Sequence, residues 1–210
     1  MQRFTSLLAT LTLTVAFGAT AFAQAPPQAP PQTRIRGTIT SFAGGVLTVQ
    51  GVGQVYKLTV PDNARYTWVL KSDLSKIGPN TYVGTVAVPQ PDGTLRATEV
   101  QIFPEAQRGV GEGSRLWDTV PNGYMTNATV TTIAPETVDK VDGRTMVVKY
   151  KDTEKKVFVP ANAPIVTFTP GDVSSLTAGA HVIVNGTKAA DGSITVTNIQ
   201  VGKDGLTPPM

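Results

Sequence analysis

Four aromatic side chains are the residues of this chain best suited to contact a ligand. Their rings offer flat apolar faces, and tyrosine and tryptophan each add a polar group. Small β-barrels often bind ligands across one sheet face and its loops, where such rings are useful. The competing interpretation is packing in a core or at an interface, because buried aromatic residues are common. The candidates are Tyr66, Trp68, Tyr82 and Trp117.

No catalytic constellation accompanies these aromatic residues. His181 is the only histidine, and no motif places a serine or carboxylate beside it to form a general-base pair. A structural or surface role for His181 is therefore favoured. The chain contains no cysteine, which excludes disulfides and zinc sites built on thiolates. We predict a non-enzyme with no cofactor and no metal site, and keep a hydrolase using scattered carboxylates as a lesser hypothesis.

The first 23 residues have the pattern of a cleavable secretory signal peptide. Arg3 supplies a positive start, an apolar stretch follows, and residues 21–23 (AFA) form a small-x-small cleavage site before Gln24. The apolar stretch is too short for a membrane anchor, and no later run reaches about 18 apolar residues. This pattern predicts a periplasmic or secreted protein without a transmembrane segment.

The charge of the chain argues against nucleic acid as a partner. The formal net charge is +3, and removing residues 1–23 takes away only Arg3. The remaining chain is thus mildly basic, whereas binding to phosphate backbones needs clustered lysine and arginine. An envelope protein or a small ligand is the expected partner, and the oligomeric state is left open.

An internal repeat is the most informative pattern in the rest of the chain. Residues 60–64 (VPDNA) recur as residues 159–163 (VPANA), and residues 92–95 (DGTL) recur as DGSI, both at an offset of 99 residues. Near the start of each copy the offset is 91, so the second copy carries about eight extra residues around 135–142. A repeat at one fixed register indicates two copies of one structural unit.

Each copy is predicted to be a series of short strands. Alternating apolar and polar residues, with turn signals such as Gly44-Gly45, are typical of β-hairpins. Ser72 or Asp73 can cap one short helical turn. In the first copy we expect strands at 38–42, 46–50, 55–60, 64–70, 82–88 and 95–103, with the helical turn at 74–77. The predicted fold is all-β, with two tandem small OB-like β-barrels, and a β-sandwich is the competing architecture.

These patterns divide the chain into six consecutive parts. The expected order is a signal peptide (1–23), a Pro/Gln-rich linker (24–33), a first barrel (34–103), a Gly/Pro-rich connector (104–125), a second barrel (126–203) and a C-terminal tail (204–210). Gly109, Gly111 and Gly113 in the connector lack the strand and helix that a phosphate-binding loop requires.

Several short motifs resemble those of one family of exported bacterial proteins. They are residues 37–39 (GTI), 85–90 (TVAVPQ), 103–106 (FPEA), 111–113 (GEG), 117–118 (WD), 125–127 (MTN) and 201–210 (VGKDGLTPPM). The chain resembles proteins built from a small OB-like barrel domain of unknown function, whose two-copy members are often labelled metal ABC transporter permeases. The chain departs from the family pattern at Ser114, where the family carries histidine. The resemblance implies fold and export, and no established activity.

Two functional hypotheses follow. Export, repetition and the missing acid–base cluster favour a non-enzymatic exported protein that binds a ligand or another protein. The alternative is a metal-handling accessory protein of the cell envelope, which the family label alone suggests. No apolar segment after residue 23 could serve a permease.

Overall fold

The computed structural model describes residues 32–138 and 141–209, and nearly all of its regular structure is β-strand. The predicted signal peptide and residues 24–31 of the predicted linker lie outside the described residues. The first strand begins at Gln32, two residues before the expected start of the fold. In the described part of the chain, no helix has the length and apolar character needed to cross a bilayer.

The described residues form thirteen strands and four short 3₁₀ helices. The first copy contains β1 (Gln32–Ala43), β2 (Val46–Gln50), β3 (Val55–Thr59), β4 (Arg65–Lys71), η1 (Leu74–Lys76), β5 (Tyr82–Pro89) and β6 (Leu95–Ile102). The connector contains η2 (Glu105–Gln107) and β7 (Gly113–Leu116). The second copy contains β8 (Tyr124–Val138), β9 (Val141–Tyr150), β10 (Thr153–Pro160), β11 (Ile165–Pro170), η3 (Val173–Ser175), β12 (His181–Lys188), β13 (Ile194–Gly202) and η4 (Lys203–Gly205).

The local predictions agree with these elements. Gly44 and Gly45 both adopt positive φ, 55° and 75°, in the turn between β1 and β2. This conformation suits a two-residue hairpin and costs glycine little. The Asp73 carboxylate caps η1 by accepting a hydrogen bond of 2.8 Å from the Ser75 backbone N–H. Asp172 caps η3 in the same way, so the repeat in sequence is also a repeat in capping chemistry.

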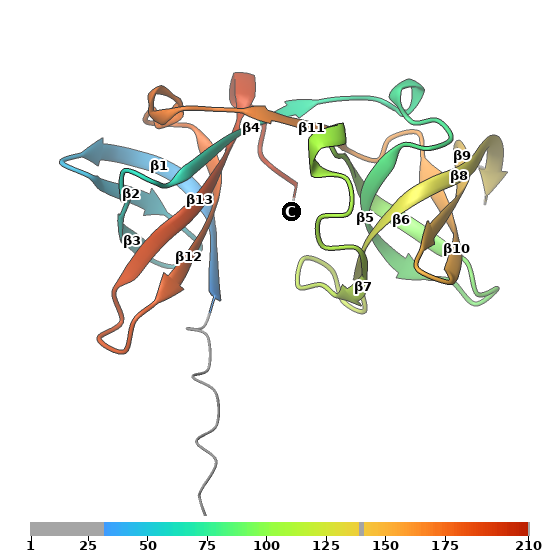
Figure 1. The fold of residues 1–210 in the computed structure, drawn as a ribbon, viewed down its shortest axis with the longest axis horizontal. Coiled ribbons are helices and arrows are strands. Elements are labelled where there is room, and N and C mark those ends of the chain that lie inside the picture. The colour runs from blue at the N-terminus through green and yellow to red at the C-terminus, as the bar shows by residue number, and fades with distance from the viewer. Residues whose placement is uncertain (1–31, 139–140, 210) are drawn as a thin grey trace, which may run out of the picture.

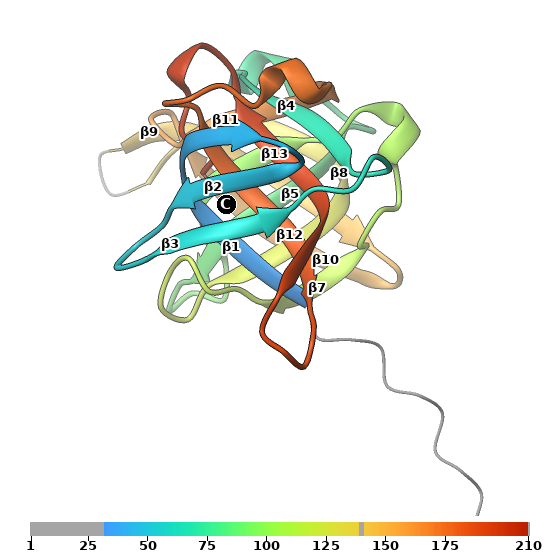
Figure 2. The ribbon, with the colours of Figure 1, turned by 90° about the vertical axis from the view of Figure 1, so that its left-hand side faces the viewer.

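The strand pairings build two lobes, each a closed ring of five strands. The first lobe has the order β1-β2-β3-β13-β12, with β12 returning to β1. The second lobe has the order β8-β9-β10-β6-β5, with β5 returning to β8. Figure 1 shows the two lobes side by side, and Figure 2 shows the first lobe facing the viewer.

The pairing corrects the expected division into sequential barrels at 34–103 and 126–203. Each copy gives its first three strands to one lobe and its last hairpin to the other, so neither lobe is a single copy. The second lobe is instead one continuous stretch, from β5 to β10. The first lobe joins the beginning and the end of the described chain, which Figure 1 shows as blue and red strands in one lobe.

The exchange follows from the path of β4 and β11. β4 pairs with β13 of the first ring, β11 pairs with β6 of the second ring, and both strands lie across the top of the molecule between the lobes (Figure 1). The seven residues of β4 span roughly 23 Å. The two strands pair with each other in antiparallel fashion, and Val69 lies opposite Phe168. These two residues are equivalents at the repeat offset of 99, so an approximate two-fold axis passes between them.

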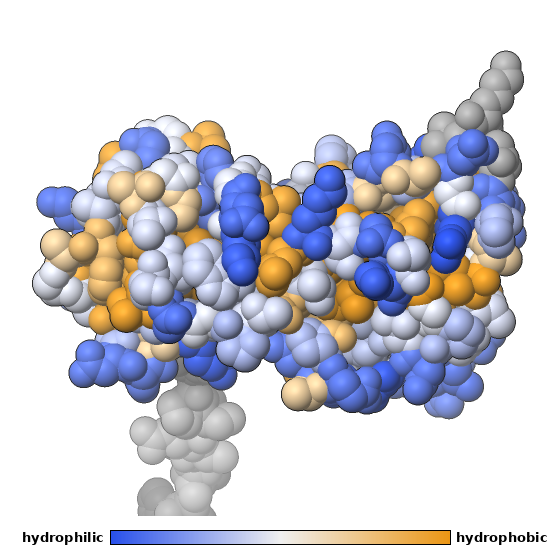
Figure 3. Space-filling view, turned by 90° about the horizontal axis from the view of Figure 1, so that it is seen from above, coloured by the Kyte–Doolittle hydropathy of each residue, from blue (hydrophilic) through white to orange (hydrophobic). Residues whose placement is uncertain are grey.

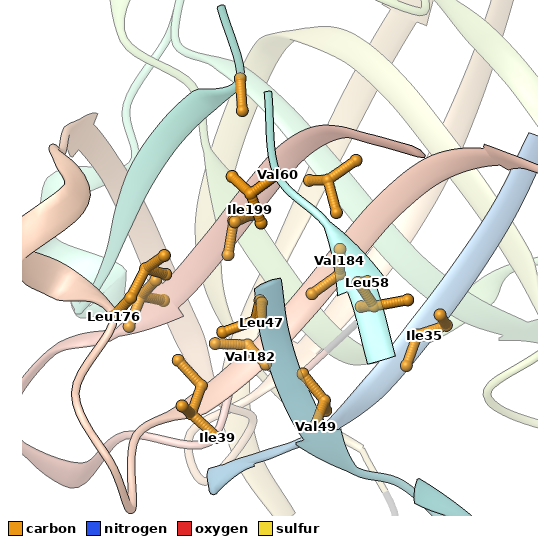
Figure 4. Close-up of a cluster of buried hydrophobic side chains, with 13 residues drawn as sticks. Ile35, Ile39, Leu47, Val49, Leu58, Val60, Leu176, Val182, Val184 and Ile199 are labelled. Atoms are coloured by element: carbon orange, nitrogen blue, oxygen red, sulfur yellow. The ribbon is translucent and has the colours of Figure 1, made fainter. Parts of the chain in front are cut away.

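The exchange of strands determines which residues form the core inside each ring. The first core combines seven residues before Lys71 with six from Leu176 onward, and Figure 4 shows side chains from both segments meeting. The second core takes all thirteen of its buried residues from the segment 77–165. The first core therefore depends on both copies folding together, whereas the second core lies within one continuous segment.

The parts outside the two rings are also ordered in the described structure. The Gly/Pro-rich connector contains β7, which pairs with β8. The extra residues of the second copy lengthen the β8–β9 hairpin. The predicted C-terminal tail folds back, and Leu206 packs against a cluster between the lobes.

A cross-copy disulfide tests the exchange of strands. Thr38 of β1 lies opposite His181 of β12, and Thr38 Oγ1 is 3.1 Å from His181 Nδ1. In this cysteine-free chain we expect the double variant Thr38→Cys, His181→Cys to form one intramolecular disulfide on oxidation, because directly opposed strand residues have suitably close Cβ atoms. Mass spectrometry of the digested monomer would detect the linked peptides. Free thiols in the oxidised monomer would contradict the pairing.

Candidate functional site

A cleft of about 190 Å³ lies between the two lobes and draws its walls from both. The first lobe contributes Asn185 and Gln200, and the second contributes Gln101 and Asn127. Arg115 and Trp117 of the connector complete the cleft, which also has Arg34 of β1 in its wall. Two copies and the connector thus meet at one place in the fold.

Strand alternation explains why polar side chains face this cleft. Val100 and Ile199 are equivalent residues that point into the second and first ring interiors. The residues that follow them, Gln101 and Gln200, therefore point outward, toward the space between the lobes. The repeat in this way places two equivalent glutamines in the same cleft.

An apolar cluster between the lobes supports the cleft. Met125 and Ile183 belong both to this cluster and to the cleft wall. Val69 and Phe168, at the approximate two-fold axis, lie in the same cluster. Seen from the side of β4 and β11, hydrophobic residues are visible where the molecule narrows between the lobes (Figure 3). The cluster joins the lobes, so the walls of the cleft have a shared support.

Three arginines converge on one side of the cleft around Trp117. The Arg34 and Arg115 guanidinium carbons lie 4.3 Å and 5.4 Å from the centre of the Trp117 ring. Arg36 binds Asp118 in a bidentate pair, with nitrogen–oxygen distances of 3.0 and 3.1 Å. Cation–π contact and this ion pair hold the connector against β1.

The charges of this cluster are unbalanced. Arg36 is paired with Asp118, and its hydrogen bonds lower the pKa of the Asp118 carboxyl. The pKa of Arg34 is lowered mainly by partial burial, and the second cause is repulsion from Arg36. Arg115 adds a further repulsive contribution and uses Nη1 to donate to the Gly111 carbonyl at 3.1 Å. Burial is the largest cause of this lowered pKa, and the attraction of Asp118 partly offsets the repulsion from Arg36 and Arg115. With three guanidinium groups and one paired carboxylate, the cluster keeps a net positive charge, which favours a negative charge nearby.

Glu99 is a buried carboxyl two residues before Gln101, which lines the cleft. Both residues lie on β6, so both side chains leave the strand on its outer face. Only 5 % of the residue is exposed, and Oε1 has no hydrogen-bond partner among the described residues. Burial raises the pKa of Glu99 to about 8, although the positive charge of Arg36 acts in the opposite direction. The side chain is therefore mostly neutral at pH 7.

Several buried polar atoms around the cleft lack partners within the described residues. Trp117 Nε1 and Asn127 Oδ1 belong to cleft-lining residues, and Arg36 Nε and Glu99 Oε1 belong to the strands beside them. Such an atom costs on the order of 1–3 kcal/mol when nothing satisfies it. The two atoms that belong to cleft-lining residues indicate a surface suited to a polar ligand or bound water.

The four aromatic residues predicted from the sequence do not converge. Trp117 alone lines the cleft. Trp68 and Tyr66, both on β4, pack against the core of the first lobe. Tyr82 is buried, and its hydroxyl donates to the Val110 carbonyl at 3.2 Å, so it acts as a packing residue.

The other residues of the cleft could not be recognised from sequence motifs. Arg34, Arg115 and Asn185 belong to no catalytic or binding motif. Gln101 and Gln200 carried one usable signal, because both are polar and occupy the same position of the repeat. That signal alone did not reveal that the two positions face each other.

The described residues offer few groups that could bind a metal ion. Within residues 32–138 and 141–209, no three histidine, aspartate or glutamate residues gather as a cation site would require. His181 is half-buried and contacts Thr38. Asp92 and Asp191 accept hydrogen bonds from their own turns, and these bonds lower the pKa of each carboxyl.

The cleft combines side-chain amides from both lobes, excess positive charge and two aromatic residues, Phe103 and Trp117. Such a surface can bind a polar ligand, but among the described residues it places no nucleophile beside a base. Comparison of the chain with family models, curated proteins and solved structures found no match.

Proposed function

We propose that this chain is a non-enzymatic, exported binding protein that holds a small ligand in the cleft between its lobes. One observation carries the proposal: Trp117 Nε1 and Asn127 Oδ1 are buried and have no hydrogen-bond partner among the described residues, beside a cleft lined by equivalent glutamines from both copies. A ligand oxygen can accept from Trp117 Nε1, and a ligand hydroxyl or amine can donate to Asn127 Oδ1, so both groups gain partners that the described residues do not supply.

The proposed architecture is a pair of OB-like barrels that exchange their terminal hairpins. The support is the order of strands in each ring. In the first ring the hairpin β12–β13 closes the strands β1, β2 and β3, because β13 pairs with β3 and β12 with β1. In the second ring the hairpin β5–β6 closes β8, β9 and β10 in the same way. A short 3₁₀ helix precedes each exchanged hairpin. OB folds present ligand surfaces on their strands and loops, and the proposed cleft lies where two such surfaces meet.

The proposed location is the periplasm or the exterior of the cell. Support comes from the signal-peptide pattern of residues 1–23 and from the resemblance to exported two-copy proteins. A chain without cysteine can fold in an oxidising compartment without forming incorrect disulfides.

A thermal-shift screen of the full exported chain tests this function. We expect at least one class among small anions, neutral sugars, amines and amino acids to raise the melting temperature, because a ligand that binds only the folded state stabilises it. The variant Gln200→Trp, which places a large ring in the cleft, should lose that shift. Asn63→Trp, at an exposed turn, should keep it. If every class failed to shift the folded protein, the binding function would be rejected.

A further inference from the structure

We propose that the ligand of the cleft is a small anion with carboxylate or phosphoryl oxygens. This inference rests on the proposed binding function and specifies its ligand class. It depends on three features of the described residues, namely the charge balance of the site, its hydrogen-bond donors and its size.

The charge balance favours an anion. Arg34 and Arg115 both lie over Trp117, and the one carboxylate in an ion pair there, Asp118, binds Arg36. Arg34 donates to the neutral Asn185 amide oxygen at 3.2 Å rather than to a carboxylate. An anion between the lobes would relieve the mutual repulsion of the guanidinium groups, and a cation would increase it.

The donors of the site match carboxylate and phosphoryl oxygens. Guanidinium groups present forked N–H donors that bind both oxygens of such an anion. Trp117 Nε1 is a further buried donor without a partner among the described residues, and the amides of Gln101 and Gln200 add N–H donors from the two lobes. The Asn127 Oδ1 acceptor needs a donor, which the hydroxyl of hydrogen phosphate supplies. Because guanidinium groups already lie over the Trp117 ring, the ring positions these donors rather than stacking on a neutral sugar.

The size of the cleft limits the ligand. Its volume of about 190 Å³ is below the roughly 300–1,000 Å³ of pockets that enclose drug-sized molecules. Inorganic phosphate or a short dicarboxylate such as succinate fits this limit. A nucleotide or an oligosaccharide would extend beyond it.

Titration calorimetry on the full exported chain tests the ligand class. The probes are inorganic phosphate, succinate, glucose and putrescine, at low ionic strength. We expect phosphate or succinate to bind with a Kd below about 1 mM, whereas glucose and putrescine do not bind. The comparison of phosphate with succinate shows which anionic group the cleft prefers.

Matched arginine variants locate the binding site. Arg34→Gln and Arg115→Gln each remove one cation from the cleft, and we expect each to weaken anion binding at least tenfold. Arg65→Gln makes the same change on the exposed start of β4, outside the cleft, and should leave the affinity unchanged. Circular dichroism of each variant confirms that its fold is intact.

The possible outcomes separate this inference from the function on which it rests. Glucose or putrescine binding that Gln200→Trp abolishes would keep the binding function and overturn the anionic class. Anion binding that is equal in Arg34→Gln, Arg115→Gln and the unmodified chain would be adventitious, and would also overturn it. No binding by any class would reject both proposals.

Discussion

Residues 72–165 expressed alone are expected to fold into a stable monomer, whereas residues 34–103, one complete copy of the repeat, are not. The longer segment contains all five strands of the second ring and all thirteen residues of its core. The copy contains about half of each core and neither complete ring. Boundaries drawn from the repeat alone would predict the opposite result.

The magnitude of the lost packing makes the difference large. Within residues 34–103 the first core lacks its six members from Leu176 onward, all of them leucine, isoleucine or valine. Burying each such side chain contributes about 1.5–3 kcal/mol, so six contribute roughly 9–18 kcal/mol. That range is comparable with the whole free energy of unfolding of a typical domain, about 5–15 kcal/mol.

Urea unfolding followed by circular dichroism would compare the two fragments, and size-exclusion chromatography would give their oligomeric state. We expect one cooperative transition for residues 72–165. For residues 34–103 we expect no folded monomer, although two such copies can complete each other's rings as a dimer by the same exchange. A cooperatively folded monomer of residues 34–103 would show that each copy closes its own ring.

The full chain is expected to lose stability as the pH rises from 5 to 8, because of Glu99. Burial raises its folded-state pKa to about 8, against an ordinary value of 4.5. Between these values the folded state binds one more proton than the unfolded state, so the free energy of unfolding falls as the pH rises. The slope is about 1.4 kcal/mol per pH unit, or roughly 4 kcal/mol over this range.

Other shifted carboxyls do not obscure this trend. Hydrogen bonds lower the pKa values of three aspartates, Asp73, Asp92 and Asp118. The stability that these carboxyls add to the folded state is present above their unfolded pKa of 3.8 and is lost only at lower pH. Their contribution is therefore nearly constant between pH 5 and 8, where Glu99 titrates.

Urea unfolding at each pH unit from 5 to 8 measures the effect, and two variants isolate it. Glu99→Gln keeps the shape of the neutral side chain, so we expect it to unfold like the unmodified chain at pH 5 and to be about 3–4 kcal/mol more stable at pH 8. Glu154→Gln, at an exposed position, should follow the unmodified chain throughout. An equal pH dependence for the unmodified chain and Glu99→Gln would exclude Glu99 as its source.

Local chemistry could be predicted from the sequence because it acts over a few neighbouring residues. The β2 strand, the positive-φ turn at Gly44-Gly45 and the Asp73 cap all depend on side chains within one hairpin or one helical turn. The repeat extended these predictions to the second copy, including the position of its extra residues in the β8–β9 hairpin. An all-β fold follows from such local patterns.

The partners of the strands could not be predicted in the same way. The two copies have equivalent strands, so β12 satisfies the hydrogen bonds of β1 as well as β5 would, and alternation within each strand is the same in both arrangements. The exchange is decided by the path of β4 and β11, whose pairing centres on Val69 and Phe168. Contacts between residues far apart in the chain set that path.

The cleft depends on this exchange and therefore belongs to the tertiary structure. From the sequence alone, Trp117 is a candidate ligand contact among four aromatic residues, and Gln101 and Gln200 are two polar residues at the same position of a repeat. The exchange brings the outer faces of both lobes together, where these residues line one cleft with Arg34 and Arg115. The sequence by itself determined the strands and the two equivalent glutamines, because alternation and turn chemistry are local. Only the tertiary structure decided that the glutamines meet, because their meeting requires each copy to complete the other's ring.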